Sequence, residues 1–415
     1  MLVGCQNEPP PPLPDPATTE AREDSAALAA AYRAQALILP SVTAAVETDV
    51  AHARTLDDAA DDPAVWVHPE DATKSLVFGS NKTGGLAAYD LTGREVAYYP
   101  IGKINNVDVL TGVPLGDTTV TLLGCSNRTL QSVNLFVIDP ATGALTDVAE
   151  QVLAVDSATI DDIYGFCLGR NGTSGKIYAI VNGKNGRMQQ FRLVEANEKF
   201  ALELVRDIAF VSQTEGMVTD NELGWLYVGE EGRGLWKLPL DPTGDDAILG
   251  GGARVQNEVA EGRVGVNPHL VADVEGLSLI ETGPGAGYLV VSVQGNFSYA
   301  VFDRGGDNAY LGSFKITDGP ATDGVEETDG LEVVAGNFGP AFPNGLLVVQ
   351  DGFNYAGDTL RPQNFKLVNW GSVEKVLGLR LNPSSSISEI IDTEGKPSAV
   401  NFKIAFRHLT KTTVQ

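Results

Sequence analysis

The period of hydrophobic and polar positions changes near residue 40. Residues 20–39 (EAREDSAALAAAYRAQALIL) are rich in alanine and follow a helical period, so we predict one helix outside the main fold. From about residue 42 the chain consists of short apolar runs broken by Gly, Asn and Asp, which is typical of strands and tight turns. The pattern divides the chain into an N-terminal helical and Pro-rich extension, 1–40, and an all-β domain, 41–410.

The strand pattern repeats six times, at intervals of about fifty residues. Each unit starts with a polar or acidic turn that leads into an apolar strand, and a second strand, a polar turn and a third strand follow. The unit starts are DDPAVWV at 61, NNVDVL at 105, DIYGFCLG at 162, QTEGMVTD at 213, DVEGLSLI at 273 and TDGLEVV at 328. Because one blade cannot bury both faces of its sheet but stacked blades can, six units predict a six-bladed β-propeller. A pair of β-sandwiches is the alternative, but it does not explain six matched units.

Two segments at the ends of this domain are candidates to close the ring. They are SVTAAVETD at 41–49 and SAVNFKIAFRHL at 398–409. Pairing between them would remove the exposed strand edges that an open ring leaves.

Composition narrows the partners of the protein. The formal net charge is -25 over 415 residues, which argues against a nucleic-acid partner because phosphate backbones need a basic surface. It does not exclude a phosphorylated small molecule, since a bound metal inverts the local charge. No run of about 18 apolar residues predicts a membrane span, and we expect a monomer.

Common catalytic motifs are absent from the sequence. The three cysteines do not make a disulfide framework, and Cys125 and Cys167 lie in apolar runs that are typical of a core. None of the four histidines has a partner at metal or triad spacing. There is no G-x-S-x-G motif, P-loop or dinucleotide fingerprint.

The first sixteen residues, MLVGCQNEPPPPLPDP, match a bacterial lipobox that is followed by a stiff Pro-rich spacer. The match predicts a lipid anchor at Cys5 and a secreted, periplasmic or outer-membrane location in a bacterium. Only Met1 to Gly4 precede the cysteine, whereas a lipoprotein signal needs a charged and an apolar region there. Either the start codon lies further upstream or the match is chance, and we favour the first.

The loop TDGPATDGVEETDG at 317–330 concentrates negative charge. Its five carboxylates stand among glycine, proline and threonine, a composition that excludes a helix or a buried strand. Carboxylates held together repel one another, so a bound cation would explain the loop. Oxygen ligands without histidine or cysteine suit a hard cation, and we predict Ca²⁺.

Equivalent turns of the six units separate positive from negative side chains. The turn after the second strand carries Lys82, Arg128 and Lys184 in units one to three. In a propeller these turns face one end of the central channel, so half of this rim is cationic. The other half is acidic or amide-bearing, from the same turns and from the unit starts. Its residues are Asp61, Asp62, Glu215, Glu230, Glu231, Asp273, Glu275, Gln294, Asn296, Asp329 and Asp351.

A cationic arc opposite bound calcium suits a phosphorylated ligand. We expect Lys82 and Lys184 to stabilise charge on phosphate oxygens, and Tyr164 to donate to the same phosphate. Glu215 and Glu231 would hold calcium, which lowers the pKa of a bound water and so provides a nucleophile. These five residues are the predicted catalytic set. The alternative is a purely structural role for these residues, in which the cations are ordinary turn residues and the acids cap turns.

These motifs resemble the β-propeller phytases, a family of calcium-dependent alkaline phytases. The matching segments run in family order from about residue 41 to residue 370. They are DAADDPAVWV, SNKTGGLAAYDL, GKINNVDV, SNR, YGF, QTEGM, YVGEE, DVEGL, QGNFSYA, ITDGPATDG, TDGLEV and QDG…QNFK.

The resemblance implies a secreted or surface enzyme of the 3-phytase type. Such enzymes hydrolyse myo-inositol hexakisphosphate (phytate), presented as its calcium complex, and need several calcium ions for stability and catalysis. Two neighbouring phosphate sites are implied, one for cleavage and one for affinity. The family's substrate-binding positions fall on Lys82, Arg128, Tyr164 and Lys184. Its calcium-binding acids fall on Glu47, Asp61, Asp62, Glu215, Glu231, Asp273, Glu275, Asp323 and Asp329, and we add Gln294 as an amide ligand.

The sequence departs from the family pattern at three places. Thr83 stands where a second lysine often follows Lys82, and Gly232 stands where an acid often follows the Glu pair. The segment after Glu47 is also longer. The longer segment makes the match of Glu47 less secure, and we expect weaker calcium or substrate binding from Thr83 and Gly232, and not loss of the reaction.

Two other classes of protein remain to be compared. A calcium-dependent propeller lactonase centres on one buried calcium and needs no cationic arc, so Lys82, Arg128 and Lys184 speak against it. A non-catalytic propeller that docks a partner has no need for several metal ions, so the acidic positions speak against that class.

Overall fold

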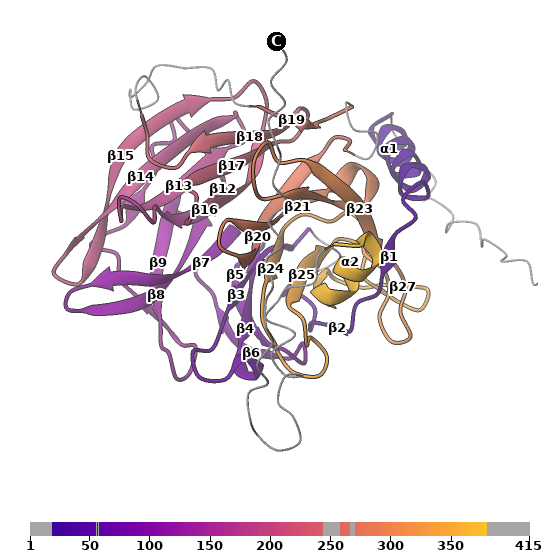
Figure 1. The fold of residues 1–415 in the computed structure, drawn as a ribbon, viewed down its shortest axis with the longest axis horizontal. Helices are drawn as coiled ribbons and strands as arrows, with labels where there is room; N and C mark the ends of the chain where they lie inside the picture. Colours follow the sequence, from indigo (N-terminus) through magenta and orange to yellow (C-terminus); the bar gives the residue numbers. More distant parts are fainter. Residues whose placement is uncertain (1–18, 55, 57, 244–257, 266–269, 380–415) are drawn as a thin grey trace, which may run out of the picture.

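The computed structural model of the protein describes residues 19–379, except for 55, 57, 244–257 and 266–269. Within these residues, six sheets of four or more strands surround a central axis, and two α-helices lie outside them (Figure 1). The predicted all-β fold, a six-bladed β-propeller with an N-terminal helix, is confirmed.

Each sheet is one blade, and its strands follow one another along the chain, apart from two short N-terminal strands that join blades five and six. Blades one to three consist of β3 (Ala60–Trp66), β4 (Leu76–Asn81), β5 (Gly85–Asp90) and β6 (Glu95–Tyr99); β7 (Ile104–Leu115), β8 (Thr118–Asn127), β9 (Ser132–Ile138), β10 (Leu145–Asp147) and β11 (Leu153–Ala154); and β12 (Ile163–Arg170), β13 (Ile177–Gly183), β14 (Arg187–Ala196) and β15 (Lys199–Ala209). Blades four to six consist of β16 (Thr214–Asp220), β17 (Trp225–Glu230), β18 (Gly234–Pro239) and β19 (Glu258–Arg263); β20 (Val274–Gly283), β21 (Ala286–Val293), β22 (Ser298–Asp303) and β23 (Tyr310–Ile316); and β24 (Leu331–Val334), β25 (Leu346–Asp351) and β28 (Asn364–Asn369). Short elements between them are η1 (Ala72–Lys74), η3 (Gln294–Asn296), β26 (Tyr355–Ala356) and β27 (Thr359–Leu360).

The first strand of every blade is the innermost one. The strands β3, β7, β12, β16, β20 and β24 each contact the next around the ring, and β24 contacts β3. They are the strands with which the six sequence units begin. Residues at the start of each unit are therefore brought to one end of the central channel.

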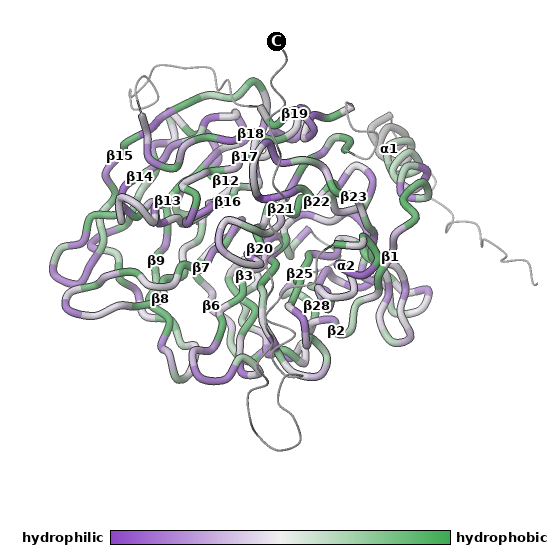
Figure 2. The backbone as a smooth tube through the Cα atoms, in the orientation of Figure 1, coloured by the Kyte–Doolittle hydropathy of each residue, from purple (hydrophilic) through white to green (hydrophobic). Residues whose placement is uncertain are grey.

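Apolar side chains between the blades form the core. Six hydrophobic clusters lie one between each pair of neighbouring sheets; for example, Phe78 of blade one packs with Leu123 of blade two. Figure 2 shows green, hydrophobic stretches through the sheets and purple in many connecting loops. Burial of both faces of each sheet is what stacking of blades provides.

The N-terminal segment closes the ring by pairing with strands of blades five and six. Strand β1 (Ser41–Val42) pairs in parallel with β23, and β2 (Val46–Glu47) pairs antiparallel with β28 of blade six. Within the described residues, β28 is thus the partner of the segment's second strand, and the predicted pairing of 41–49 with 398–409 stays a prediction. Residues 398–409 lie outside the described residues.

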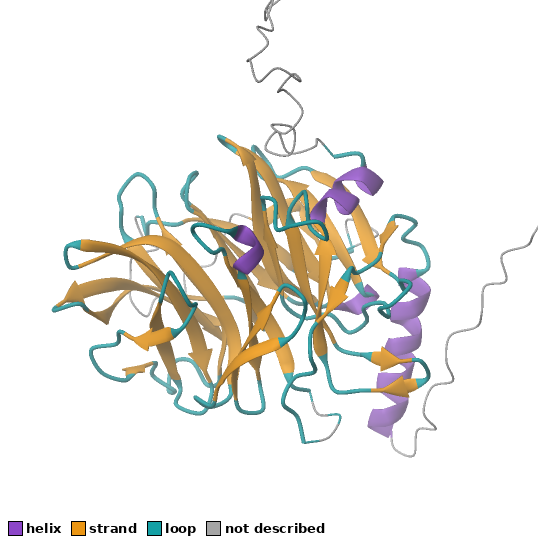
Figure 3. Ribbon diagram, turned by 90° about the horizontal axis from the view of Figure 1, so that it is seen from below, coloured by secondary structure: helices purple, strands orange, loops and turns teal. Residues whose placement is uncertain are grey.

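Two helices accompany the propeller. The predicted helix 20–39 is α1 (Thr19–Gln35), which stands along the outside of the molecule (Figure 3). It does contact the main fold, since the Tyr32 ring packs edge-on against Phe297 with ring centroids 5.2 Å apart. Helix α2 (Trp370–Leu377) was not predicted; it buries Trp370 and Val373. In the described part of the chain, no helix is both long and apolar enough for a membrane crossing.

Candidate active site at the rim of the channel

An irregularity shared by blades one to five places the site residues. Each inner strand pairs once with the second strand, and the register then shifts before pairing resumes; in β3, Ala60 pairs with Asn81 and Pro63 with Gly79. Equivalent shifts occur at the starts of β7, β12, β16 and β20. Such β-bulges re-aim side chains. The residues within them are Asp61, Asp62, Asn105, Asn106, Tyr164, Glu215 and Glu275.

Glycines after several of these residues let neighbouring bulges pack closely. A Cβ on Gly165 would lie 2.0 Å from the carbonyl oxygen of Glu215, and one on Gly216 would lie 2.1 Å from that of Glu275. No side chain fits at these distances. In each of the pairs Tyr164-Gly165 and Glu215-Gly216, the first residue therefore provides a side chain to the site, and the glycine allows close backbone contact between neighbouring blades.

On the cationic side, Lys82 projects from blade one into a group of carboxylates. Its Nζ lies 2.8 Å from Asp58 Oδ2 and 3.1 Å from Asp329 Oδ2. A third carboxylate, Asp61, lies 3.4 Å from Nζ. Burial lowers the pKa of Lys82, but the three carboxylates outweigh it and hold the pKa above its ordinary value. Lys82 is therefore a fixed positive charge at the boundary between both halves of the rim.

Tyr164 lies between the other two predicted cations. The Lys184 ammonium is 4.7 Å from the centre of the Tyr164 ring, and the Arg128 guanidinium is 5.6 Å from it. Arg128 also donates to Asp162, with Nη2 2.5 Å from Oδ2. Burial, and then the charge of Glu215, raises the pKa of Tyr164, so its hydroxyl stays a hydrogen-bond donor. The structure thus brings all four predicted substrate-binding residues to one arc.

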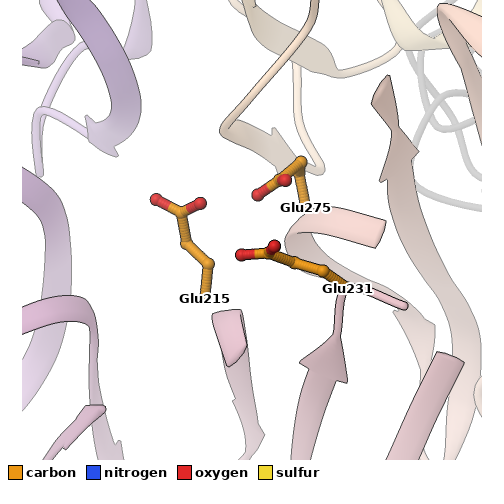
Figure 4. A group of neighbouring side chains, drawn as sticks. All are labelled: Glu215, Glu231 and Glu275. Carbon is orange, nitrogen blue, oxygen red and sulfur yellow. The ribbon is translucent and has the colours of Figure 1, made fainter. Parts of the chain in front are cut away.

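On the acidic side, three glutamates from blades four and five converge. One carboxylate oxygen from each of Glu215, Glu231 and Glu275 lies within 4.8 Å of those of the other two, and the side chains point toward one another in Figure 4. Glu215 accepts from Asn105 Nδ2 at 2.7 Å. Buried oxygens of Glu231, Glu275 and the nearby Asp61 have no hydrogen-bond partner among the described residues. We call Glu215, Glu231 and Glu275 the glutamate cluster.

The glutamate cluster is electrostatically costly without a cation. Burial, followed by the charge of Glu215, raises the pKa of Glu231 to about 7 and raises the pKa of Glu275 as well. Burial also raises the pKa of Asp329 to about 6, against the opposing effect of Lys82. Raised pKa values show that the fold penalises the charged forms.

The remaining predicted metal ligands take different positions. Asp273 and Gln294 line the same acidic cavity, of about 480 Å³, as the glutamate cluster, and Gln294 donates to Asp329 Oδ1 at 2.5 Å. The carboxylate of Asp62 instead accepts from the backbone of Val107 at 3.0 Å, so it connects blades one and two.

Glu47 and Asp323 gather around a buried lysine, away from the glutamate cluster. Lys366 Nζ lies 2.7 Å from Glu47 and 3.2 Å from Asp351, and it also contacts Asp323. We call these three acids with Lys366 the lysine-centred cluster. The metal-binding role of Glu47 and Asp323 stays a prediction.

The loop 317–330 distributes its charge over both clusters. Asp323 belongs to the lysine-centred cluster, whereas Asp329 and Glu327 line the acidic cavity. Asp318 accepts from the Gly324 backbone and so stabilises the turn itself. Burial, then the charge of Asp351, raises the pKa of Glu326 to about 8.

Sequence reasoning missed several residues that touch the predicted ones. Asp58 pairs with Lys82, and Asp162 pairs with Arg128. Asn105 donates to Glu215 and accepts from Arg128 Nη1 at 3.4 Å, so it connects the two halves of the rim. All three stand inside the recurrent motifs, in DAADD, NNVDV and DIYGF, but a partner of a cation has no spacing signal of its own.

Fold and site together define a class: a six-bladed propeller with a cationic arc and a convergent carboxylate cluster at one end of its channel. The Phytase family model matches residues 17–391. A curated 3-phytase of Bacillus subtilis (strain 168) is 39% identical over 340 residues, which are 81% of this chain and 85% of that protein. The chain belongs to the phytase family, and the prediction of an enzyme of the phytase type is confirmed.

Comparison with solved structures gives more distant matches. BBS1N in complex with ARL6DN is 12% identical, covers 73% of this chain and 76% of its own, and has a TM-score of 0.39. The β-propeller domain of Cps50 (Swd1) from Myceliophteria thermophila is 11% identical, covers 74% and 83%, and has a TM-score of 0.38.

Proposed function

We propose that the protein is a calcium-dependent phosphomonoester hydrolase that releases phosphate from myo-inositol hexakisphosphate. The observation that carries the proposal is the glutamate cluster, with its unpartnered buried oxygens, beside the arc of Lys82, Tyr164 and Lys184. Membership of the phytase family and the similarity to a 3-phytase support this choice of substrate.

The residues present suit calcium. The three glutamates offer oxygen ligands only, which a hard cation prefers. Buried oxygens of Glu231 and Glu275 lack hydrogen-bond donors, and a cation would compensate them. Gln294 and Asp273 line the same cavity and extend the set of oxygen donors. We infer that more than one calcium ion binds between the glutamate cluster and Asp329.

The protein's own residues orient the phosphate group. Lys184 and Lys82 approach it from two sides and stabilise the charge that develops on its equatorial oxygens. Tyr164, whose raised pKa keeps its proton in place, donates a hydrogen bond to one oxygen. Calcium supplies positive charge that neutralises carboxylates and phosphate, and it lowers the pKa of a water nucleophile. No serine, cysteine or histidine nucleophile is required.

The experiment is phosphate release from phytate by the full chain, with calcium and with excess chelator. We expect release only with calcium. We also expect calcium to raise the melting temperature, because a ligand of the folded state stabilises it by about 2.7 kcal/mol at a hundredfold excess over its Kd. Release that is equal under both conditions would contradict the metal requirement. A calcium-dependent melting temperature without any release would indicate a non-catalytic calcium-binding propeller.

The location of the protein is a separate proposal. The lipobox-like start supports a secreted, periplasmic or outer-membrane lipoprotein that is acylated at Cys5. Cys5 lies outside the described residues, and metabolic labelling with a fatty acid, compared with Cys5→Ser, would test it.

A further inference from the structure

Helix α1 forms one wall of a cavity that adjoins the acidic one. This cavity has a volume of about 660 Å³ and is lined mostly by apolar side chains, among them Ala27, Leu28 and Phe297. It shares four residues with the acidic cavity, which are Asp273, Gln294, Glu327 and Phe353. The sequence pattern placed this helix outside the main fold, but in the structure it lies across this cavity from two predicted calcium ligands, Asp273 and Gln294.

Helix α1 contacts the short helix η3, which carries Gln294. The Tyr32 ring packs edge-on against Phe297, the residue that ends η3, and Gln35 Nε2 donates to the Phe297 carbonyl oxygen at 3.2 Å. Phe297 is buried and has a left-handed backbone conformation (φ 51°), which is unfavourable for a bulky side chain. Such a conformation persists only where the surroundings hold it, and α1 contacts both the ring and the carbonyl group of this residue.

On its other side, η3 rests on the backbone that carries Asp273. A Cβ at Gly295 would lie 1.4 Å from the carbonyl oxygen of Ala272, so only glycine allows this approach. The Gln294 backbone N–H donates to the Asp273 carbonyl oxygen at 2.9 Å, and the Gln294 side chain donates to Asp329 Oδ1 at 2.5 Å. A shift of η3 would therefore displace Gln294 and Asp273 and break the contact with Asp329.

Tyr32 also lies close to the acidic loop 317–330. Burial, and then the charge of Glu326, raises the pKa of the Tyr32 hydroxyl, and the charge of Glu327 acts in the same direction. The end of α1 is fixed on blade five, because Lys315 Nζ of β23 donates to the Gln35 carbonyl oxygen at 3.3 Å. The helix is thus held at the point where η3 and the acidic loop meet.

We propose that α1 is a positioning element of the acidic cavity, in which Tyr32 and Gln35 hold η3 so that Gln294 and Asp273 stay in place to bind calcium. This inference rests on the proposed function, which assigns calcium to this cavity. Neither Tyr32 nor Gln35 is among the residues that line the acidic cavity, so both act on calcium through η3. Ligands that are fixed before the ion arrives lose less conformational entropy on binding, and their affinity is higher.

The test measures calcium binding by calorimetry, with the full chain and with the variants Tyr32→Ala, Tyr32→Phe and Gln35→Ala. The calcium concentration that gives half-maximal phosphate release from phytate is measured in parallel. We expect Tyr32→Ala to raise both the Kd for calcium and this concentration about tenfold, and to change kcat at saturating calcium less than about twofold. Tyr32→Phe keeps the ring contact and should behave like the wild type. Gln35→Ala removes one hydrogen bond and should raise the Kd about fivefold.

Two controls separate positioning from a general loss of packing. Arg33→Ala changes an exposed neighbour on the same helix. Val373→Ala removes buried packing from α2, whose residues line neither cavity. Both variants should bind calcium like the wild type, although Val373→Ala should lower the melting temperature in chelator.

An unchanged Kd for calcium in Tyr32→Ala, or an equal rise in Val373→Ala, would overturn the positioning role. If Tyr32→Ala does not fold, the Kd of Gln35→Ala decides the question in the same way. A wild-type protein that binds calcium but releases no phosphate would contradict the proposed function, and the calorimetry of the variants would still decide the role of α1. A wild-type protein that binds no calcium would overturn this inference, whether or not it releases phosphate.

Discussion

The described residues contain two carboxylate clusters, which differ in whether a side chain of the protein provides a positive counter-charge. In the lysine-centred cluster, the ammonium of Lys366 lies 2.7 Å from Glu47 and 3.2 Å from Asp351, and its side chain is fully buried. In the glutamate cluster, none of the three carboxylates forms an ion pair with a lysine or arginine in the described part of the chain. The first cluster has a counter-ion within the chain, and for the second the proposed function assigns that role to calcium from solution.

This difference suggests that the lysine-centred cluster serves folding and that the glutamate cluster serves function. A cluster with a covalently attached cation can form as the chain folds, at any calcium concentration. A cluster without one keeps buried oxygens without partners, as on Glu231 and Glu275, and gains most from an added cation. It also lies beside Tyr164 and Lys184, where a phosphate group would meet the metal. We infer that the glutamate cluster couples calcium to the reaction and that the lysine-centred cluster couples blade six to the N-terminal strand β2.

Removal of the built-in cation is expected to have the largest effect on stability. Lys366→Met leaves Glu47, Asp323 and Asp351 together without compensation, and breaking a buried ion pair costs about 3–5 kcal/mol. Urea unfolding in chelator measures this loss, with the exposed Lys375→Met as the control. Calcium should restore part of the stability, because the freed acids can then bind it. An unchanged unfolding midpoint would show that Lys366 is not the counter-ion of this cluster.

A substitution in the glutamate cluster should lower activity without lowering stability, the opposite of what we expect for Lys366→Met. Glu231→Gln removes a charged ligand but keeps the shape of the side chain, so we expect kcat for phosphate release to fall about 10²- to 10³-fold, as when one electrostatic contact to a transition state is lost. Stability in chelator should not fall, because one of three repelling carboxylates has been neutralised.

The matched control for this substitution is Glu70→Gln, an exposed glutamate outside both clusters. Near-normal turnover in Glu231→Gln would remove Glu231 from the metal site. A loss of stability equal to that of Lys366→Met would remove the distinction between the two clusters.

Local sequence patterns predicted the six blades and the positions of their turns, but not the directions in which the acidic side chains point. The six units, and the equivalent positions of Lys82, Arg128 and Lys184, follow from strand period and turn chemistry, which act over a few residues. The direction of each acidic side chain cannot be read from these patterns, because a shift of one residue in the register moves a side chain to the opposite face of a strand. Glu231 faces the site, whereas Glu230 is fully buried and accepts from Trp236 Nε1 at 2.8 Å.

Long-range pairing was also beyond the sequence pattern. The segment 41–49 was recognised as a closing segment, but its pairing with β28 was not predicted. The central position of Lys366 between acids from three separate segments has no spacing signal either. Such contacts depend on the closed ring and only appear once all six blades are placed.

The smallest expected effect is the pH dependence of the metal-free protein. Burial raises the pKa of Glu231 to about 7 and that of Asp329 to about 6. A carboxyl group whose pKa is higher in the folded state contributes stability that is present below its unfolded pKa and is lost as the pH rises through its folded pKa. In chelator, the free energy of unfolding should therefore fall by on the order of 1 kcal/mol between about pH 5 and pH 8.

Two comparisons assign this fall to the glutamate cluster. Glu231→Gln cannot titrate at position 231, so its stability should depend less on pH than that of the wild type or of Glu70→Gln. Calcium should flatten the wild-type curve, because a bound cation favours the charged carboxylates at every pH in this range. If the pH dependence of Glu231→Gln in chelator equals that of the wild type, the titration belongs to other buried acids, such as Glu326, whose pKa is raised to about 8. The glutamate cluster would then hold less uncompensated charge than its geometry indicates.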